Sequence, residues 1–128
     1  MDRGFNIDRP DRFVPEYLLK EPEYRGGAAK TKTGYGVRAW DASVMEREVA
    51  LFEALGHRFD REPFVEAIGG EETAPSLGKQ RPPDFNAAQL AQQLERWIGA
   101  VRAAWPHTVV LLYSNWLPSK LNDVMAAC

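Results

Sequence analysis

Cysteine is nearly absent from this sequence, in which Cys128 is the one example among 128 residues. A single thiol cannot form a disulfide within the chain or supply a cluster of sulfur ligands to a metal. Long apolar runs are also missing, because no window approaches the roughly 18 consecutive apolar residues of a membrane-spanning helix. The charged opening "MDRGFNIDRPDRF" lacks the apolar centre of a signal peptide. We therefore expect no membrane partner and a cytoplasmic location.

An excess of one charge is missing as well. The chain has 16 Lys and Arg residues against 18 Asp and Glu residues, for a net charge of −2, and the basic residues are scattered. This balance disfavours nucleic acid as a partner. His57 and His107 lack the spaced partners of a metal site, and the glycine pairs at 26–27 and 69–70 lack the phosphate-loop pattern. We expect no metal and no cofactor.

What is present is the composition of one ordinary soluble domain, with 45% hydrophobic and 27% charged residues. Proline and glycine repeatedly interrupt residues 1–40, which are predicted to be mostly loop with at most a short helical turn over residues 14–20. Residues 41–128 are predicted to run helix, strand, helix, strand, short helix.

Apolar spacing predicts two helices. The first, residues 42–56, begins with Asp41 as N-cap or with Ser43 in a capping box, and Gly56 ends it. The second spans residues 86–105.

Two short apolar runs, residues 64–69 and 108–114, are predicted to be strands. The second run, within "HTVVLLYSN", is continuously apolar, which is typical of a parallel strand with both faces covered. The two strands are expected to be parallel neighbours in an α/β unit, so the residues just beyond their ends should meet at one rim. These residues are Glu71 and Glu72 after one strand, and Ser114, Asn115 and Trp116 after the other.

The succession "VRAWDASVMEREVALFEALGHRFD", "FVEAIGGEETA" and "VVLLYSNWLP" resembles the central part of a bacterial cellulase-like (β/α)8-barrel glycoside hydrolase. The similarity extends over about residues 2–118. It implies a partial barrel in which residues 64–69 are the fourth strand and residues 108–114 the fifth. It also implies a carbohydrate partner.

By this resemblance, Glu72 is the acid/base of a retaining hydrolase and Glu71 a solvated neighbour. Asn115 belongs to the substrate-binding rim, and Trp40, Tyr113 and Trp116 are candidates for stacking on sugar rings. Each has a simpler interpretation. A carboxylate in a glycine-rich loop is usually just solvated, and Trp40 and Tyr113 suit a packed core.

The expected nucleophile, after the seventh barrel strand, has no counterpart in this sequence. A full barrel needs about 250 residues, so the chain corresponds to about half of one and is expected to be inactive alone. We expect it to associate with itself or with a complementing barrel segment. The alternative is a small α/β protein without catalysis that binds a partner through exposed apolar surface.

Overall fold

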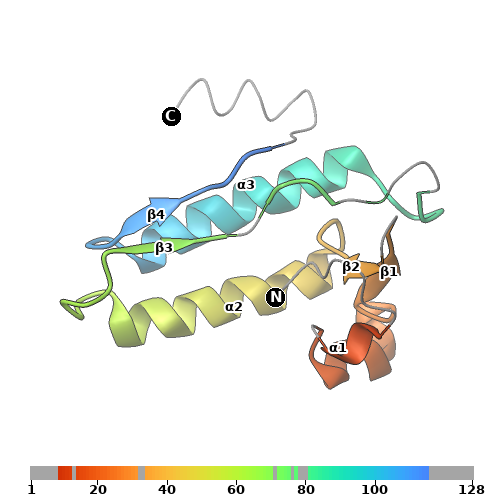
Figure 1. Ribbon diagram of the computed structural model, residues 1–128, viewed down its shortest axis with the longest axis horizontal. Helices are drawn as coiled ribbons and strands as arrows, with labels where there is room; N and C mark the ends of the chain where they lie inside the picture. Colours follow the sequence, from red (N-terminus) through yellow and green to blue (C-terminus); the bar gives the residue numbers. More distant parts are fainter. Residues whose placement is uncertain are drawn as a thin grey trace.

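The computed structural model describes residues 9–12, 14–31, 34–70, 72–75, 77 and 81–115. These residues form a mixed α/β structure with three α-helices and two small sheets, one antiparallel and one parallel, and they form no closed barrel (Figure 1). The elements in chain order are η1 Pro10–Arg12, α1 Glu16–Lys20, η2 Pro22–Tyr24, β1 Ala28–Lys30, β2 Tyr35–Val37, α2 Ala42–Phe59, β3 Ala67–Gly69, α3 Ala87–Ala104 and β4 Val109–Leu111.

Side-chain caps begin both long helices, as predicted. The carboxylate of Asp41 accepts a hydrogen bond from the Ser43 amide at 3.0 Å, and the Asn86 side chain accepts from the first-turn amides of α3. Each cap satisfies amides that have no partner within the helix, and a cap of this kind typically contributes about 1 kcal/mol. Of the two predicted starts for α2, the structure has Asp41 as the N-cap.

The predicted end of α2 at Gly56 is wrong, because the helix continues to Phe59. Gly56 instead allows α2 to approach α3. A Cβ atom on Gly56 would lie 2.5 Å from the carbonyl oxygen of Ala104, closer than real Cβ atoms come. Next to this contact, the indole nitrogen of Trp105 donates to the carbonyl oxygen of Phe52 at 3.0 Å. Glycine serves here as the site of close helix packing rather than as a helix stop.

The core lies between the two long helices, which run side by side in the same direction (Figure 1). Phe52 and Trp97 meet edge to face with ring centroids 5.0 Å apart. Burying a large apolar side chain contributes about 1.5–3 kcal/mol, so this layer supplies much of the stabilisation. Its most deeply buried members are Val44, Leu90, Val101 and Trp105.

The two predicted strands pair in parallel, in the register Ala67 to Val109 and Gly69 to Leu111. This pair lies against one side of the helix layer and runs opposite to α2 and α3 (Figure 1). The helix N-termini and the strand C-termini therefore lie toward the same end of the molecule. The prediction of adjacent parallel strands is confirmed, while the regular strand is shorter than expected in both cases.

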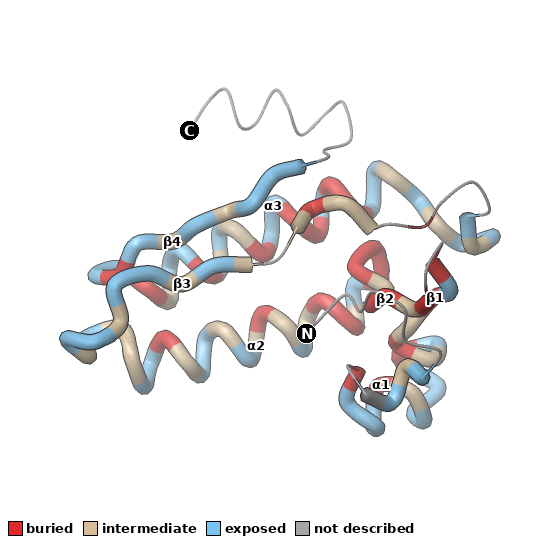
Figure 2. The backbone as a smooth tube through the Cα atoms, viewed as in Figure 1, coloured by how far each residue is buried: buried red, intermediate tan, exposed pale blue. Residues whose placement is uncertain are grey.

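The expectation that both faces of these strands are covered is wrong. Val109, Leu111 and Tyr113 are 57%, 55% and 61% exposed, whereas Val110 and Leu112 between them pack against the core. Figure 2 shows that exposed residues predominate along β3 and β4, with a partly buried residue at the centre of each. Alternate residues of a strand point to opposite faces, so one face packs on the helices and the other is open to solvent. A continuous apolar run gave no sign of this difference.

Residues 1–40 contain more regular structure than the predicted loop. The predicted helical turn is present as α1, but β1 and β2 also form an antiparallel hairpin, with Ala28 opposite Val37. The chain enters this hairpin through three successive residues with positive φ, namely Arg25 at 48°, Gly26 at 84° and Gly27 at 60°. Two of the three are glycines, which adopt this conformation without the steric cost of a Cβ atom.

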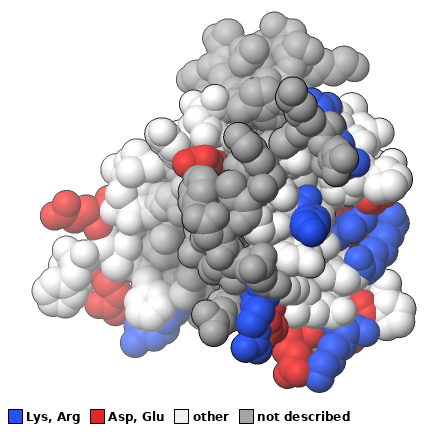
Figure 3. Space-filling model, turned by 45° about the vertical axis from the view of Figure 1, so that its right-hand side comes forward, with Lys and Arg blue, Asp and Glu red and all other residues white. Residues whose placement is uncertain are grey.

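The surface fits the balanced charge of the sequence. Acidic and basic side chains lie next to one another over the visible described residues (Figure 3). Ion pairs between them include Arg58 with Glu62 at 3.2 Å. Among the described helices, none is both long enough and apolar enough to cross a membrane.

Candidate functional site

The candidate site lies where the chain leaves the two parallel strands. Hydrogen bonding between the strands continues past their ends, because the Gly70 amide donates to Leu111 O at 3.4 Å and the Thr73 amide donates to Tyr113 O at 3.2 Å. The two segments thus remain side by side for several residues beyond the regular sheet. This continuation brings Glu72 and Asn115 to the same rim, as the sequence predicted.

Asn115 connects directly to Glu72. Its side-chain nitrogen donates to Oε2 of Glu72 at 2.7 Å, while its side-chain oxygen accepts from the Ala74 amide at 3.0 Å and from the Thr73 hydroxyl at 3.4 Å. Asn115 therefore holds both the carboxylate and the backbone of the loop that carries it. Thr73 is fully buried and Glu72 is half-buried. We call Glu72 and Asn115 the rim pair.

Gly70 sets the path of the loop that leads to Glu72. A Cβ atom on Gly70 would lie 2.7 Å from the ring of Trp97, so no other residue fits there without movement of the indole or the backbone. Trp97 is itself almost fully buried on α3. The position of the rim carboxylate is thereby tied to the packing of the core.

The rim pair can perform proton chemistry. A half-buried carboxylate with one oxygen held by an amide donor has a defined orientation, which a general acid or base needs in order to meet a substrate proton. Retaining glycoside hydrolysis also needs a second carboxyl group about 5 Å from the first. Glu72 can supply one of these two groups.

Of the two predicted aromatic residues that the structure describes, Tyr113 lies next to the rim and Trp40 lies elsewhere. Tyr113 belongs to the exposed row on β4 and its continuation, next to the rim, where its ring is accessible. Trp40 is only 3% exposed and packs edge to face on Phe85 with centroids 5.2 Å apart, which agrees with the simpler interpretation of a core residue. Trp116 and Glu71 lie outside the described residues.

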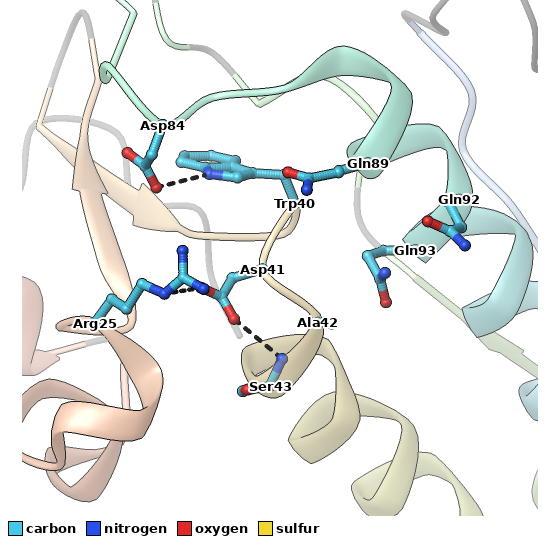
Figure 4. A pocket seen from close by; sticks show the side chains of 9 residues that line it. All are labelled: Arg25, Trp40, Asp41, Ala42, Ser43, Asp84, Gln89, Gln92 and Gln93. Atoms are coloured by element: carbon cyan, nitrogen blue, oxygen red, sulfur yellow. Dashed lines mark hydrogen bonds and ion pairs between the residues drawn. The ribbon is translucent and has the colours of Figure 1, made fainter.

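Trp40 belongs to a different feature, a polar cavity of about 210 Å³ between the start of α2 and the start of α3 (Figure 4). The indole nitrogen of Trp40 donates to Asp84 at 3.2 Å. No motif in the sequence predicts this cavity, which we call the glutamine cavity. Its lining includes Trp40, Asp41, Asp84, Gln89, Gln92 and Gln93.

Gln93 was the signal in the sequence that could have revealed this cavity. It lies three residues after Leu90 and four before Trp97, at helical spacing on the buried face of α3. A polar side chain in the middle of an apolar helix face must be satisfied by a partner or a ligand, because burial without a hydrogen bond is costly. The apolar residues around it at helical spacing predict the helix without revealing a polar member of the buried face.

His57 and His107 lie on the end of the molecule opposite the rim pair. Both line a second cavity of about 430 Å³, together with Asp60. Asp60 accepts hydrogen bonds from the amides of His107 and Thr108, both at 3.0 Å, which fixes the start of β4. No group of three or more possible metal ligands occurs among His, Cys, Asp and Glu in the part of the chain that the structure describes.

Comparison of the chain with models of protein families, with curated proteins and with solved structures finds no match. The function is therefore argued from the geometry of the molecule.

Proposed function

We propose that the chain is a glycoside-hydrolase-like unit in which Glu72 serves as the acid/base of a carbohydrate site. The observation that carries this proposal is the rim pair, in which Asn115 holds Glu72 at 2.7 Å beyond the ends of two parallel strands. Functional groups of (β/α)8 barrels lie at this end of their strands. The resemblance of the sequence to cellulase-like hydrolases adds the substrate class.

The open sheet face supports the further proposal that this unit needs additional strands to be active. In a barrel, one strand face packs on the helices and the other fills the interior. Val109 and Leu111 are 57% and 55% exposed. Apolar residues of a barrel interior would have this exposure if the strands on the opposite side of the barrel were missing. We propose that a complementing barrel segment covers this face and brings the nucleophile that faces Glu72.

The experiment has two parts. Purified chain is titrated with a panel of gluco-, xylo- and manno-oligosaccharides while amide signals are followed by NMR, and it is assayed separately for hydrolysis of aryl glycosides. We expect saturable shifts at the Asn115 side-chain amide and the Ala74 backbone amide, because both belong to the rim. We expect no turnover, because an acid/base without a nucleophile cannot complete the double displacement.

The control variants are Asn115→Ala, which should lose the shift at the Ala74 amide, and Arg61→Ala at the opposite end of the molecule, which should keep it. Rim signals that respond to none of the oligosaccharides would end the carbohydrate proposal. Turnover by the wild type that disappears in Glu72→Gln would support the role of Glu72 and overturn the proposed need for a further segment.

The second candidate function is partner binding without catalysis, and the exposed row of Val109, Leu111 and Tyr113 favours it. Exposed apolar patches on soluble proteins mark interaction sites. Sedimentation at increasing concentration tests for self-association. We expect association by the wild type and its loss in Val109→Thr/Leu111→Thr, since threonine retains β-propensity. Leu51→Thr, at a leucine on α2 that is 47% exposed, is the matched control and should associate as the wild type does.

A further inference from the structure

The glutamine cavity lies on the same end of the molecule as the rim pair but is built from different residues. It opens between the Arg25 turn, the first turn of α2 and the first two turns of α3 (Figure 4). Its volume of about 210 Å³ is below the roughly 300–1,000 Å³ of pockets that hold drug-sized ligands. An occupant would therefore be small, of the size of one sugar ring or less.

Gln93 is the polar group that points to an occupant. Its side chain descends from α3 toward the first turn of α2 (Figure 4), and the residue is only 7% exposed. Within the described residues, its oxygen Oε1 is buried and has no hydrogen-bond partner. A buried carbonyl oxygen without a partner costs about 1–3 kcal/mol. A molecule in the cavity that donates a hydrogen bond to Gln93 would remove this cost.

The charged groups around the cavity already neutralise one another. The Oδ2 atom of Asp41 lies 3.5 Å from Nε of Arg25. Asp84 pairs with Arg38 and also accepts from the indole of Trp40. A charged ligand would have to compete with these pairs, whereas a neutral ligand leaves them intact. The lining therefore favours a ligand without net charge.

The two helix N-termini beside the cavity are already capped by side chains of the chain itself. Asp41 caps the amide of Ser43, and Asn86 caps the amides of Ala88 and Gln89. Phosphate sites at helix N-termini depend on free first-turn amides. Here side chains of the chain itself already hold one first-turn amide of α2 and two of α3, which leaves fewer amides for an anion.

From this pattern we propose that the glutamine cavity binds a small neutral polyhydroxylated molecule, a polyol or a single sugar ring, and that Gln93 accepts a hydrogen bond from one of its hydroxyl groups. The carboxamides of Gln89 and Gln92 at the mouth can both donate and accept, which suits hydroxyl groups. The inference does not rest on the proposed function of Glu72.

The test is a titration of the intact chain with glycerol, myo-inositol, D-glucose and D-xylose, with inorganic phosphate as the charged comparison. The indole N–H signal of Trp40, assigned with Trp40→Phe, reports on the cavity wall by NMR. We expect a saturable shift with at least one of the polyols or sugars and none with phosphate. Gln93→Leu should weaken binding by about tenfold or more, because a ligand hydroxyl loses its acceptor.

Gln93→Leu should fold, since leucine is apolar, similar in size and placed on an apolar helix face. Its thermal midpoint is measured to establish this, and Glu95→Leu on the exposed side of α3 is the matched control, which should bind as the wild type does. Glu72→Gln should also bind unchanged, which separates this inference from the function of the rim. A Trp40 signal that responds to none of the probes, equal binding by Gln93→Leu, or saturation by phosphate would each overturn the inference.

Discussion

At each end of the parallel sheet, one carboxylate accepts hydrogen bonds from a neighbouring segment of the chain. The carboxylates are Asp60 at one end and Glu72 at the other, and their hydrogen-bond donors differ in kind. Asp60 accepts from backbone amides of His107 and Thr108, at the end where β4 begins. Glu72 accepts from the side chain of Asn115, at the end where the strands finish. Backbone donors keep their positions in the folded chain, whereas the side-chain donor of Asn115 can also rotate away. The comparison indicates a structural acid at one end and, at the other, the carboxylate for which we propose a chemical role.

The electrostatics of Asp60 agree with a structural role. Desolvation raises the pKa of Asp60, but the hydrogen bonds from His107 and Thr108 lower it by more, so that the pKa lies below its usual range. The folded state therefore stabilises the ionised form of Asp60 more than the unfolded state does. The following four predictions test the contrast with Glu72, from the largest expected effect to the smallest.

Replacement of Asp60 by alanine should destabilise the chain more than any change at the rim pair. Asp60→Ala leaves the amides of His107 and Thr108 without their acceptor, and an unpaired donor is costly at Thr108, which is only 4% exposed. We expect a clear fall in the thermal midpoint, measured by circular dichroism. The neighbouring exposed residue offers a control, Arg61→Ala, which should change the midpoint little. An Asp60→Ala midpoint equal to that of the wild type would show that Asp60 does not have a structural role.

Acidic pH should lower the stability of the folded chain, partly because Asp60 becomes protonated. Because the pKa of Asp60 is lower in the folded state than in the unfolded state, its contribution is present above the ordinary aspartate pKa of about 3.9 and is lost as the pH falls through the folded value. The midpoint difference between wild type and Asp60→Asn should be constant near neutral pH and shrink below about pH 4. A difference that grows with acid would contradict this sign.

Asn115→Ala should have a smaller effect on stability and a larger one on the order of the rim. It removes a hydrogen bond to Glu72 and one from the Ala74 amide, at an exposed residue. The expected loss is about 1 kcal/mol in the free energy of unfolding, measured in urea. Hydrogen exchange at the Ala74 amide should accelerate. If exchange there is unchanged, Asn115 does not hold the loop.

Glu72→Gln should have the smallest effect on stability, within about 0.5 kcal/mol. The glutamine oxygen can still accept the hydrogen bond from Asn115, so only the charge is lost. Urea unfolding of this variant beside the wild type gives the value. A loss comparable with that of Asp60→Ala would show that Glu72 is also a structural acid and would end the contrast between the two ends.

Much of the architecture could be predicted from local patterns. The caps at Asp41 and Asn86 and the apolar spacing behind them predicted two helices, and two short apolar runs predicted the parallel strands. The meeting of Glu72 and Asn115 followed because parallel strands end at the same rim. These inferences succeeded where sequence neighbours determine the structure.

Other features depend on contacts that no local pattern displays. The β1–β2 hairpin consists of three-residue strands within a stretch rich in proline and glycine. Strands of this length contain too few residues for an alternating apolar pattern to be recognised. The exposure of Val109 and Leu111 depends on what lies opposite the sheet, which an apolar run does not reveal. Gly56 looked like a helix end because the approach of Ala104, 48 residues away, is not visible in sequence.

The contact of Gly70 with Trp97 gives the rim an optical reporter. A Cβ atom at Gly70 would meet the indole ring at 2.7 Å, so the loop that carries Glu72 and the chromophore of α3 cannot move independently. Any rearrangement that shifts the carboxylate along the rim should change the surroundings of Trp97 and therefore its emission. The emission of Trp97 can thus report such a rearrangement in the unlabelled chain, once the other three tryptophans, Trp40, Trp105 and Trp116, are replaced by phenylalanine.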